Sequence, residues 1–264
     1  MIKIIKFFYR LFLPFLKLPF DAKKYPGKYF LNLINLTTDQ VIRVVGSVWH
    51  ILFRNKKFDK KLECHGNYKI FPKNINSKSV IYSCGIATNI SFDESVSNTF
   101  NCNVFMFDPT KKSNEFMRKN INSKLKFYNI GIWINDEKKK FYHQNDPENV
   151  DISVTNFFKT NHYIELPCRS IASLMHEFNH KQIDILKMDI EGAAFDILNN
   201  LIENKIYPNQ IIVELERPFF IYNAKFTELF AYLIKRKSLR RNLKHLGYDL
   251  VELKANELLA IKKS

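Results

Sequence analysis

The chain of 264 residues has little cysteine, and the cysteines that it has are not arranged in pairs. The four of them, Cys64, Cys84, Cys102 and Cys168, lie far apart, and no C-x-x-C pair occurs. Such spacing indicates neither a zinc site nor a disulfide framework. The pattern predicts reduced thiols in a cytoplasmic protein, and no metal site is expected.

No apolar run reaches the 18 or so uncharged residues that a membrane-spanning helix requires. The first 20 residues come nearest, but Lys3, Lys6, Arg10 and Lys17 interrupt them. These charges, with no small-residue cleavage site after them, also argue against a signal peptide. Basic residues mixed with aromatic ones are typical of a helix on an anionic membrane surface. We therefore predict peripheral membrane contact through residues 1–20; packing on the domain or on a partner subunit is the open alternative.

Acidic residues are scarce relative to basic ones, and the imbalance is concentrated at the N-terminus. Residues 1–60 contain 12 Lys and Arg against 3 Asp, which gives +9 of the total net charge of +15. The chain is long enough, and at 46% apolar residues hydrophobic enough, to bury a substantial core. We divide it into a basic, apolar extension at residues 1–60 and one main domain at residues 61–264.

Glycine is also scarce, and the G-x-G-x-x-G loop of many nucleotide-binding domains is absent. A single glycine turn is present, because the strand expected at 80–84 leads into Gly85. The next expected strand, at 104–108, ends in Asp108. Gly85 and Asp108 are 23 residues apart. This separation matches the roughly 20 residues between the glycine turn and the ribose-binding acid of a βαβ nucleotide site. The sequence therefore predicts such a unit here.

The most informative stretch runs from 183 to 192, where an apolar run of strand length ends in two carboxylates and a glycine. Asp189, Glu191 and Gly192 lie at its end, and apolar residues at helical spacing follow. In open α/β sheets, ligands bind beyond the carboxyl ends of the strands. Both carboxylates are therefore expected at a site, with a solvated turn or an acidic helix start as the alternative.

The rest of the chain alternates strands and helices, which is typical of an α/β fold. Strands are expected near 80–84, 104–108, 126–133, 184–190, 210–216, 248–253 and 257–262. Only a short turn separates the last two, so we expect them to pair as an antiparallel hairpin. Two extended segments, 138–143 and 162–167, interrupt the alternation around a polar loop.

The order of these pieces resembles the FkbM-type family of S-adenosylmethionine-dependent methyltransferases, which have the class I Rossmann-like fold. The strings that carry the resemblance are VIYSCGIATNISFDESV, VFMFDPT, FYNIGIW, IDILKMDIEGAAFDIL and QIIVELE, between Val80 and Glu216. The resemblance implies a mostly parallel seven-stranded sheet with an antiparallel last strand. It also implies S-adenosyl-L-methionine as the cofactor and methyl transfer as the activity.

The resemblance assigns a cofactor site as well. The turn at Gly85 would approach the methionine moiety, Asp108 would hold the ribose, and residues 129–131 would border the adenine. The cofactor-binding residues that it implies are Ser83, Gly85, Ile86, Asp108, Pro109, Asn129, Gly131 and Asp189. Ala87 stands where family members commonly have a second glycine, which leaves a catalytically inactive, cofactor-binding homologue as one alternative.

Methyl transfer to a hydroxyl needs a group that removes a proton, since the sulfonium already activates the methyl. Asp189 is the preferred base, and Glu191 and Glu214 are further catalytic candidates. Acidic side chains that lie close together at the carboxyl ends of neighbouring strands raise one another's pKa, which suits a base that works near neutrality. His143 and His162 stay open as bases, and the alternative role of Asp189 is to orient the cofactor's ammonium or to cap the next helix.

The resemblance favours O-methylation of a sugar hydroxyl in a glycan or glycolipid. A basic cluster on an expected helix offers a nucleic-acid alternative, because it favours phosphate contacts. Its members are Lys235, Arg236, Lys237, Arg240, Arg241 and Lys244. No aromatic stacking motif accompanies them, and a charge run is usually a solvated face. An RNA-directed methyltransferase is therefore the second interpretation.

Overall fold

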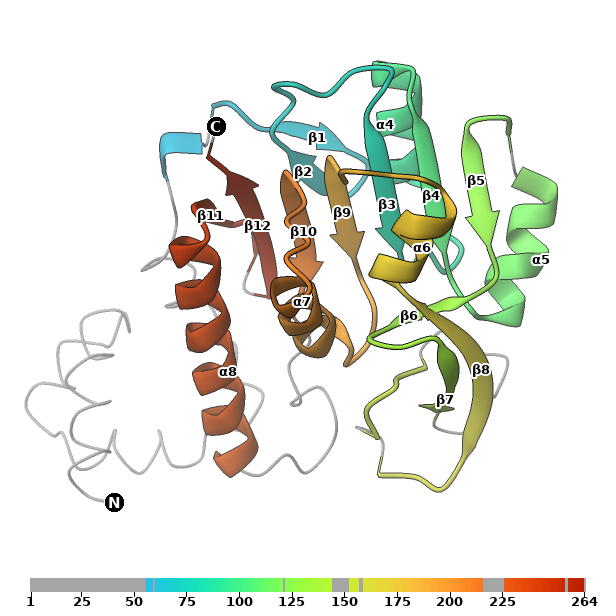
Figure 1. Cartoon of the computed structure of the whole chain (residues 1–264). Helices are drawn as coiled ribbons and strands as arrows, with labels where there is room; N and C mark the ends of the chain where they lie inside the picture. The colour runs from blue at the N-terminus through green and yellow to red at the C-terminus, as the bar shows by residue number, and fades with distance from the viewer. Residues whose placement is uncertain are drawn as a thin grey trace, which may run out of the picture. The chain divides into compact units, whose positions relative to one another are not determined.

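The computed structural model describes most of the predicted main domain (Figure 1). The described residues are 56–58, 60–120, 122–143, 152–156, 159–215, 226–254 and 256–263, with the backbone alone for 226–230. The predicted membrane-contact segment at residues 1–20 lies outside them, and so does Glu216. No helix in the described ranges is both long and apolar enough to span a bilayer.

A seven-stranded sheet in the order β11-β12-β10-β9-β3-β4-β5 forms the centre of the domain. Its strands are β3 (Val80–Cys84), β4 (Asn103–Phe107), β5 (Leu125–Tyr128), β9 (Ile185–Met188), β10 (Gln210–Glu214), β11 (Tyr248–Glu252) and β12 (Glu257–Lys262). Neighbours from β5 to β10 are parallel, whereas β12 pairs antiparallel with both β10 and β11. The predicted fold class and the predicted C-terminal hairpin are confirmed.

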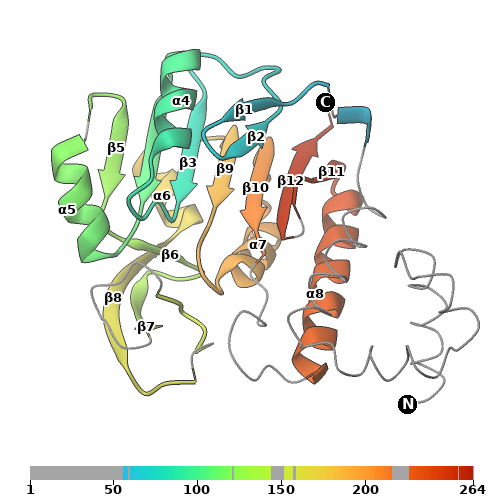
Figure 2. The same cartoon turned by 180° about the vertical axis from the view of Figure 1, so that it is seen from behind.

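Helices cover both faces of this sheet, which explains why its central strands are nearly continuous apolar runs. In Figure 1, α6 (Ile171–Glu177), α7 (Ala194–Glu203) and α8 (Phe226–His245) lie in front of the sheet. Figure 2 shows α4 (Ser91–Phe100) on the opposite face. All four residues of β9 are buried, and so are the last four of β3.

Beside the sheet lie smaller elements that the sequence did not predict. The short 3-10 helix η2 (Lys56–Phe58) precedes a hairpin of β1 (Glu63–His65) and β2 (Tyr68–Ile70). The hairpin lies on the same face as α4, as Figure 2 shows. Helix α5 (Lys111–Asn120), by contrast, connects β4 to β5, where the alternating pattern predicts a helix.

The single strand predicted at 126–133 is wrong, because the chain divides there into two strands of different sheets. β5 ends at Tyr128, and β6 (Gly131–Trp133) begins a second sheet after a two-residue turn. The Asn129 side chain makes this turn: its Nδ2 donates to the carbonyl oxygens of Asp108 at 2.8 Å and Thr110 at 3.1 Å. An asparagine amide that binds backbone carbonyls favours a turn over a continued strand.

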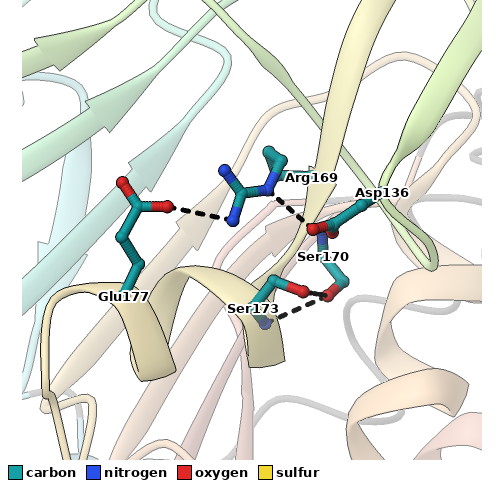
Figure 3. A network of polar contacts seen from close by, with 5 residues as sticks. All are labelled: Asp136, Arg169, Ser170, Ser173 and Glu177. Atoms are coloured by element: carbon teal, nitrogen blue, oxygen red, sulfur yellow. Dashed lines mark hydrogen bonds and ion pairs between the residues drawn. The ribbon is translucent and has the colours of Figure 1, made fainter.

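The second sheet has three strands and lies at the carboxyl edge of the large sheet (Figure 1). β7 (Glu137–Tyr142) and β8 (Tyr163–Ser170) correspond to the two extended segments, and they pair antiparallel. A polar network joins this sheet to α6 (Figure 3): Arg169 contacts Asp136 at 2.7 Å and Glu177 at 2.9 Å. Ser170, which accepts from the Ser173 N–H, caps α6.

The basic cluster on α8 is smaller on the surface than the sequence indicates. Arg236 and Arg240 are buried, and both pair with the buried carboxylate of Glu252 on β11. These two arginines therefore support the docking of α8 on the sheet, since a buried charge requires a partner. Lys235, Lys237, Arg241 and Lys244 are exposed.

Candidate active site

A cleft of about 310 Å³ opens at the carboxyl ends of β3, β4 and β9. The strand order reverses between β3 and β9, and open α/β sheets bind ligands at such a switch point. The predicted site residues that line the cleft are Gly85, Ile86, Asp108, Pro109, Gly131, Asp189 and Glu191. Ser83 is buried within β3, and neither it nor Asn129 or Glu214 is among the lining residues.

Gly85 brings two strand ends into direct contact. Its φ is +74°, and a Cβ built on it would lie 2.7 Å from the carbonyl carbon of Asp189 and closer still to the carbonyl oxygen. No side chain fits between the two turns, and a positive φ favours glycine. Ala87 follows in the left-handed region at φ +47°. The position where relatives commonly carry a second glycine thus keeps a glycine-like conformation in this chain.

Asp108 holds this turn in place. Its Oδ2 accepts from the N–H groups of Ile86 at 3.1 Å and Ala87 at 3.0 Å, while its Oδ1 accepts from the N–H and the hydroxyl of Thr110. The side chain is buried at the cleft wall. A carboxylate offers about four acceptor positions, so protein donors occupy its capacity. The hydrogen bond from a ribose hydroxyl to Asp108 stays a prediction, because the hydroxyl would have to replace one of these protein donors.

Replacing Asp108 by alanine is expected to weaken S-adenosylmethionine binding by roughly 1–3 kcal/mol, because the donors of the turn lose their acceptor. Isothermal titration calorimetry measures this directly. Asp184→Ala is the matched control: Asp184 also accepts from a backbone N–H, that of Val80, but at the opposite edge of the sheet. If the affinity for S-adenosylmethionine falls equally in both variants, or in neither, Asp108 is not part of the cofactor site.

Asp189 receives a hydrogen bond that no local sequence pattern predicts. The hydroxyl of Tyr68 on β2 donates to its Oδ2 at 2.5 Å, and both residues line the cleft. Burial, followed by the charge of Asp189, raises the pKa of Tyr68 far above that of a free phenol. Tyr68 therefore stays protonated and acts as a donor. A tyrosine in a three-residue strand 121 positions away carries no local signal of this contact.

A second polar cluster that we did not predict lies beneath the glycine turn. Lys187, buried in β9, donates from Nζ to the carbonyl oxygen of Gly85 at 2.7 Å. Asp93 on α4 is completely buried; burial raises its pKa, and the ammonium of Lys187 opposes the rise. A lysine within an otherwise apolar strand was the available signal, since buried lysines require partners.

Glu214 and Glu191 are placed differently from Asp189. Glu214, at the end of β10, is partly buried and accepts from the side-chain amide of Asn256. Burial raises the pKa of Glu214, and the carboxylates of Asp189 and Glu257 raise it further. Glu191 is exposed at the cleft, and its carbonyl oxygen accepts from the hydroxyl of Ser153 at 2.9 Å.

The two histidines that stay open as bases lie beside each other, with ring centroids 5.9 Å apart. Neither His143 nor His162 is among the residues that line the cleft. No cluster of His, Cys, Asp and Glu in the described part of the chain could hold a metal ion.

The three-stranded sheet and the described residues between β7 and β8 supply the apolar wall. Ile132, Phe141 and Ile152 line the cleft, and all three are buried. A Cβ at Gly131 would lie 2.7 Å from the Cys168 sulfur, so the glycine permits close packing of β6 on β8. The cleft therefore combines an apolar side with an acidic one, which suits a ligand that has both a ring system and cationic groups.

The strand order and the position of the cleft define a class I Rossmann-like methyltransferase fold. A model of the methyltransferase FkbM domain matches residues 74–250. The chain therefore belongs to the FkbM methyltransferase family, which confirms the predicted family and the predicted cofactor, S-adenosylmethionine.

Other similarities are more distant. Over 143 residues the chain is 27% identical to the human probable methyltransferase-like protein 24, covering 53% of this chain and 33% of that protein. It thus spans about a third of that relative's length. Similar solved structures include an SAH-bound methyltransferase of Podospora anserina (10% identity, 94% and 89% of the two chains covered, TM-score 0.38). Human N-acetylserotonin methyltransferase in complex with SAM is another (12% identity, 85% and 55% of the two chains covered, TM-score 0.33).

Proposed function

We propose that the protein is an S-adenosylmethionine-dependent O-methyltransferase that acts on a sugar hydroxyl of a glycan or glycolipid. The observation that supports this most is the position of the Asp189 carboxylate. It lines the cleft, its backbone contacts the Gly85 turn, and Tyr68 donates to it. A carboxylate held at a cofactor cleft can take the proton of an acceptor hydroxyl.

The residues of the cleft fit the cofactor. The apolar side chains of Pro109, Ile132 and Phe141 suit a purine ring, and the backbone of the Gly85 turn suits the methionine end. When bound, S-adenosylmethionine supplies a methyl group that its sulfonium activates.

The residues of this chain then have two tasks, alignment and proton removal. The Gly85 turn and Asp189 are in backbone contact, so the cofactor and the base keep one geometry. Glu214 is not among the residues that line the cleft, whereas Asp189 is. Asp189 is therefore the acid of this pair that serves as the base, and it takes the proton as the acceptor oxygen receives the methyl group.

Methyl-labelled S-adenosylmethionine tests the acceptor class. The protein is incubated with the label and with cell extract separated into glycan, lipid, RNA and protein pools. We expect label in the glycan or glycolipid pool and none with Asp189→Asn. Label confined to the RNA pool would replace the glycan proposal. Cofactor binding by calorimetry with no label in any pool would indicate an inactive homologue.

An RNA acceptor is the second candidate. The observation that favours it is the exposed remainder of the basic cluster on α8, namely Lys235, Lys237, Arg241 and Lys244. Four exposed cations would give salt-dependent phosphate binding. Arg236 and Arg240 contribute nothing to such a surface, because Glu252 pairs with both inside the domain.

The peripheral membrane contact proposed for residues 1–20 makes a separate prediction. Four basic residues near an anionic surface contribute roughly 1 kcal/mol each, and the aromatic residues among them add a component that salt does not screen. Deleting residues 1–20 should therefore abolish sedimentation with phosphatidylserine-containing vesicles and preserve cofactor binding.

Phosphatidylcholine vesicles are the control for that experiment. Equal sedimentation of the full chain and the deletion variant would contradict the membrane proposal. A deletion variant that no longer folds would assign the segment to the domain instead.

A further inference from the structure

The β1–β2 hairpin lies outside the matched family domain, which begins at residue 74, and yet it reaches the candidate active site. Tyr68 is its contribution to the cleft. The hairpin is attached to the large sheet by the Gln210 side chain, which donates to the Phe71 carbonyl oxygen at 2.6 Å and accepts from the Phe71 N–H at 2.9 Å. This paired amide contact fixes the end of β2 on β10.

The turn of the hairpin is fixed as well, against α4. A Cβ built on Gly66, at φ +53°, would lie 2.6 Å from the backbone nitrogen of Phe92. The Nδ1 of His65 lies 2.9 Å from the Ser95 hydroxyl. With contacts at both ends, the hairpin presents Tyr68 from a rigid support, which is what precise orientation of an active-site group requires.

The ring of Tyr68 is held in a defined orientation. Its centroid lies 5.5 Å from that of Phe92 in an edge-on arrangement, and Lys187 Nζ lies 4.9 Å from the ring centroid. Lys254 Nζ lies 5.9 Å from the same centroid. Cations near an aromatic face are attracted to it, so these contacts stabilise the ring in one position. The hydroxyl is thereby directed at Asp189 Oδ2.

We propose that Tyr68 is a positioning residue for methyl transfer: its hydrogen bond commits Oδ2 of Asp189, fixes the orientation of that carboxylate, and leaves Oδ1 to take the acceptor's proton. The proposal rests on the function proposed above. The proton moves from the acceptor hydroxyl to Oδ1, the acceptor oxygen bonds to the methyl carbon, and the methyl–sulfur bond breaks with its electron pair going to sulfur. Tyr68 exchanges no proton in this step.

The burial of Tyr68 supports this role. Burial raises the pKa of its phenol, so Tyr68 stays a donor at neutral pH. Charged groups that face the Tyr68–Asp189 pair include Lys187, Lys254, Glu214 and Glu257.

Tyr68→Phe tests the proposal, because it removes the hydroxyl and keeps the ring. Tyr248→Phe is the matched control: Tyr248 is buried and donates to the Pro208 carbonyl oxygen at 2.6 Å, on β11 and away from the cleft. With the acceptor pool that the wild type labels, we expect kcat to fall roughly 10–100-fold in Tyr68→Phe, with KM for the cofactor nearly unchanged.

A second measurement needs no acceptor. In protein labelled with ¹³C at the aspartate carboxyl carbons, the Asp189 signal is assigned by its loss in Asp189→Asn. It should change position at neutral pH in Tyr68→Phe and stay in place in Tyr248→Phe. An unmoved signal, or an unchanged kcat in Tyr68→Phe, would overturn the proposal. If no pool accepts label from the wild type, the proposed function fails, while the carboxyl signal still decides whether Tyr68 holds Asp189.

Discussion

Replacing Asp189 by asparagine is expected to lower turnover by roughly 10²–10⁴-fold, the range that loss of a general base produces. The amide has the shape of the carboxylate and can still accept from the Tyr68 hydroxyl, so the cleft should keep its form. It cannot take a proton, however. Cofactor affinity, measured by calorimetry, should therefore change little while methyl transfer nearly stops.

Two further variants make this result specific. Asp196→Asn removes an exposed carboxylate on α7, outside the cleft, and should leave turnover unchanged. Glu191→Gln tests the other carboxylate of the same turn. If turnover falls in Glu191→Gln and not in Asp189→Asn, the base has been assigned to the wrong residue. A collapse of cofactor affinity in Asp189→Asn would assign Asp189 an orienting role instead.

The second large effect is expected at Gly85. In Gly85→Ala the new methyl group overlaps the Asp189 carbonyl, and the residue must also keep a φ of +74°. Strain and overpacking together should lower the free energy of unfolding by roughly 2–6 kcal/mol. The two turns must separate to relieve the overlap, so cofactor binding should be lost even where the variant stays folded.

Gly247→Ala is the control that separates these two causes. Gly247 has a φ of +86°, but a Cβ there meets nothing within 4 Å. This variant carries the backbone strain without the overlap and should cost about 1 kcal/mol. Urea unfolding of both variants gives the difference. If the two lose equal stability and Gly85→Ala still binds the cofactor, the close contact between the turns is not what shapes the site.

The features that could be predicted from the sequence are those that a strand and its end encode locally. β3, β4 and β9 are short apolar runs that stop at a polar turn, so both their position and the site at their ends followed from the pattern. Gly85 and Asp189 could be placed at one edge for this reason. That their backbones touch depends on the parallel pairing of β3 with β9, about 100 residues apart.

Features that depend on a distant partner were missed. The apolar residues at 126–133 look like one strand, because the pattern does not show that the Asn129 amide binds the carbonyls of Asp108 and Thr110. Arg236 and Arg240 look like surface charge, because Glu252 lies in a later strand. In each case a long-range polar contact outweighs the local pattern.

The contact between Gly85 and Asp189 has a consequence for how this enzyme family can diversify. The Gly85 turn and Asp189 directly follow two neighbouring core strands and touch through their backbones, whereas the apolar wall of the cleft comes largely from the three-stranded sheet. That sheet can accordingly change sequence, and with it the shape of the pocket, at little cost to the reaction geometry. We expect a change of acceptor to act through β7 and β8, while the contact between the Gly85 turn and Asp189 is inherited intact.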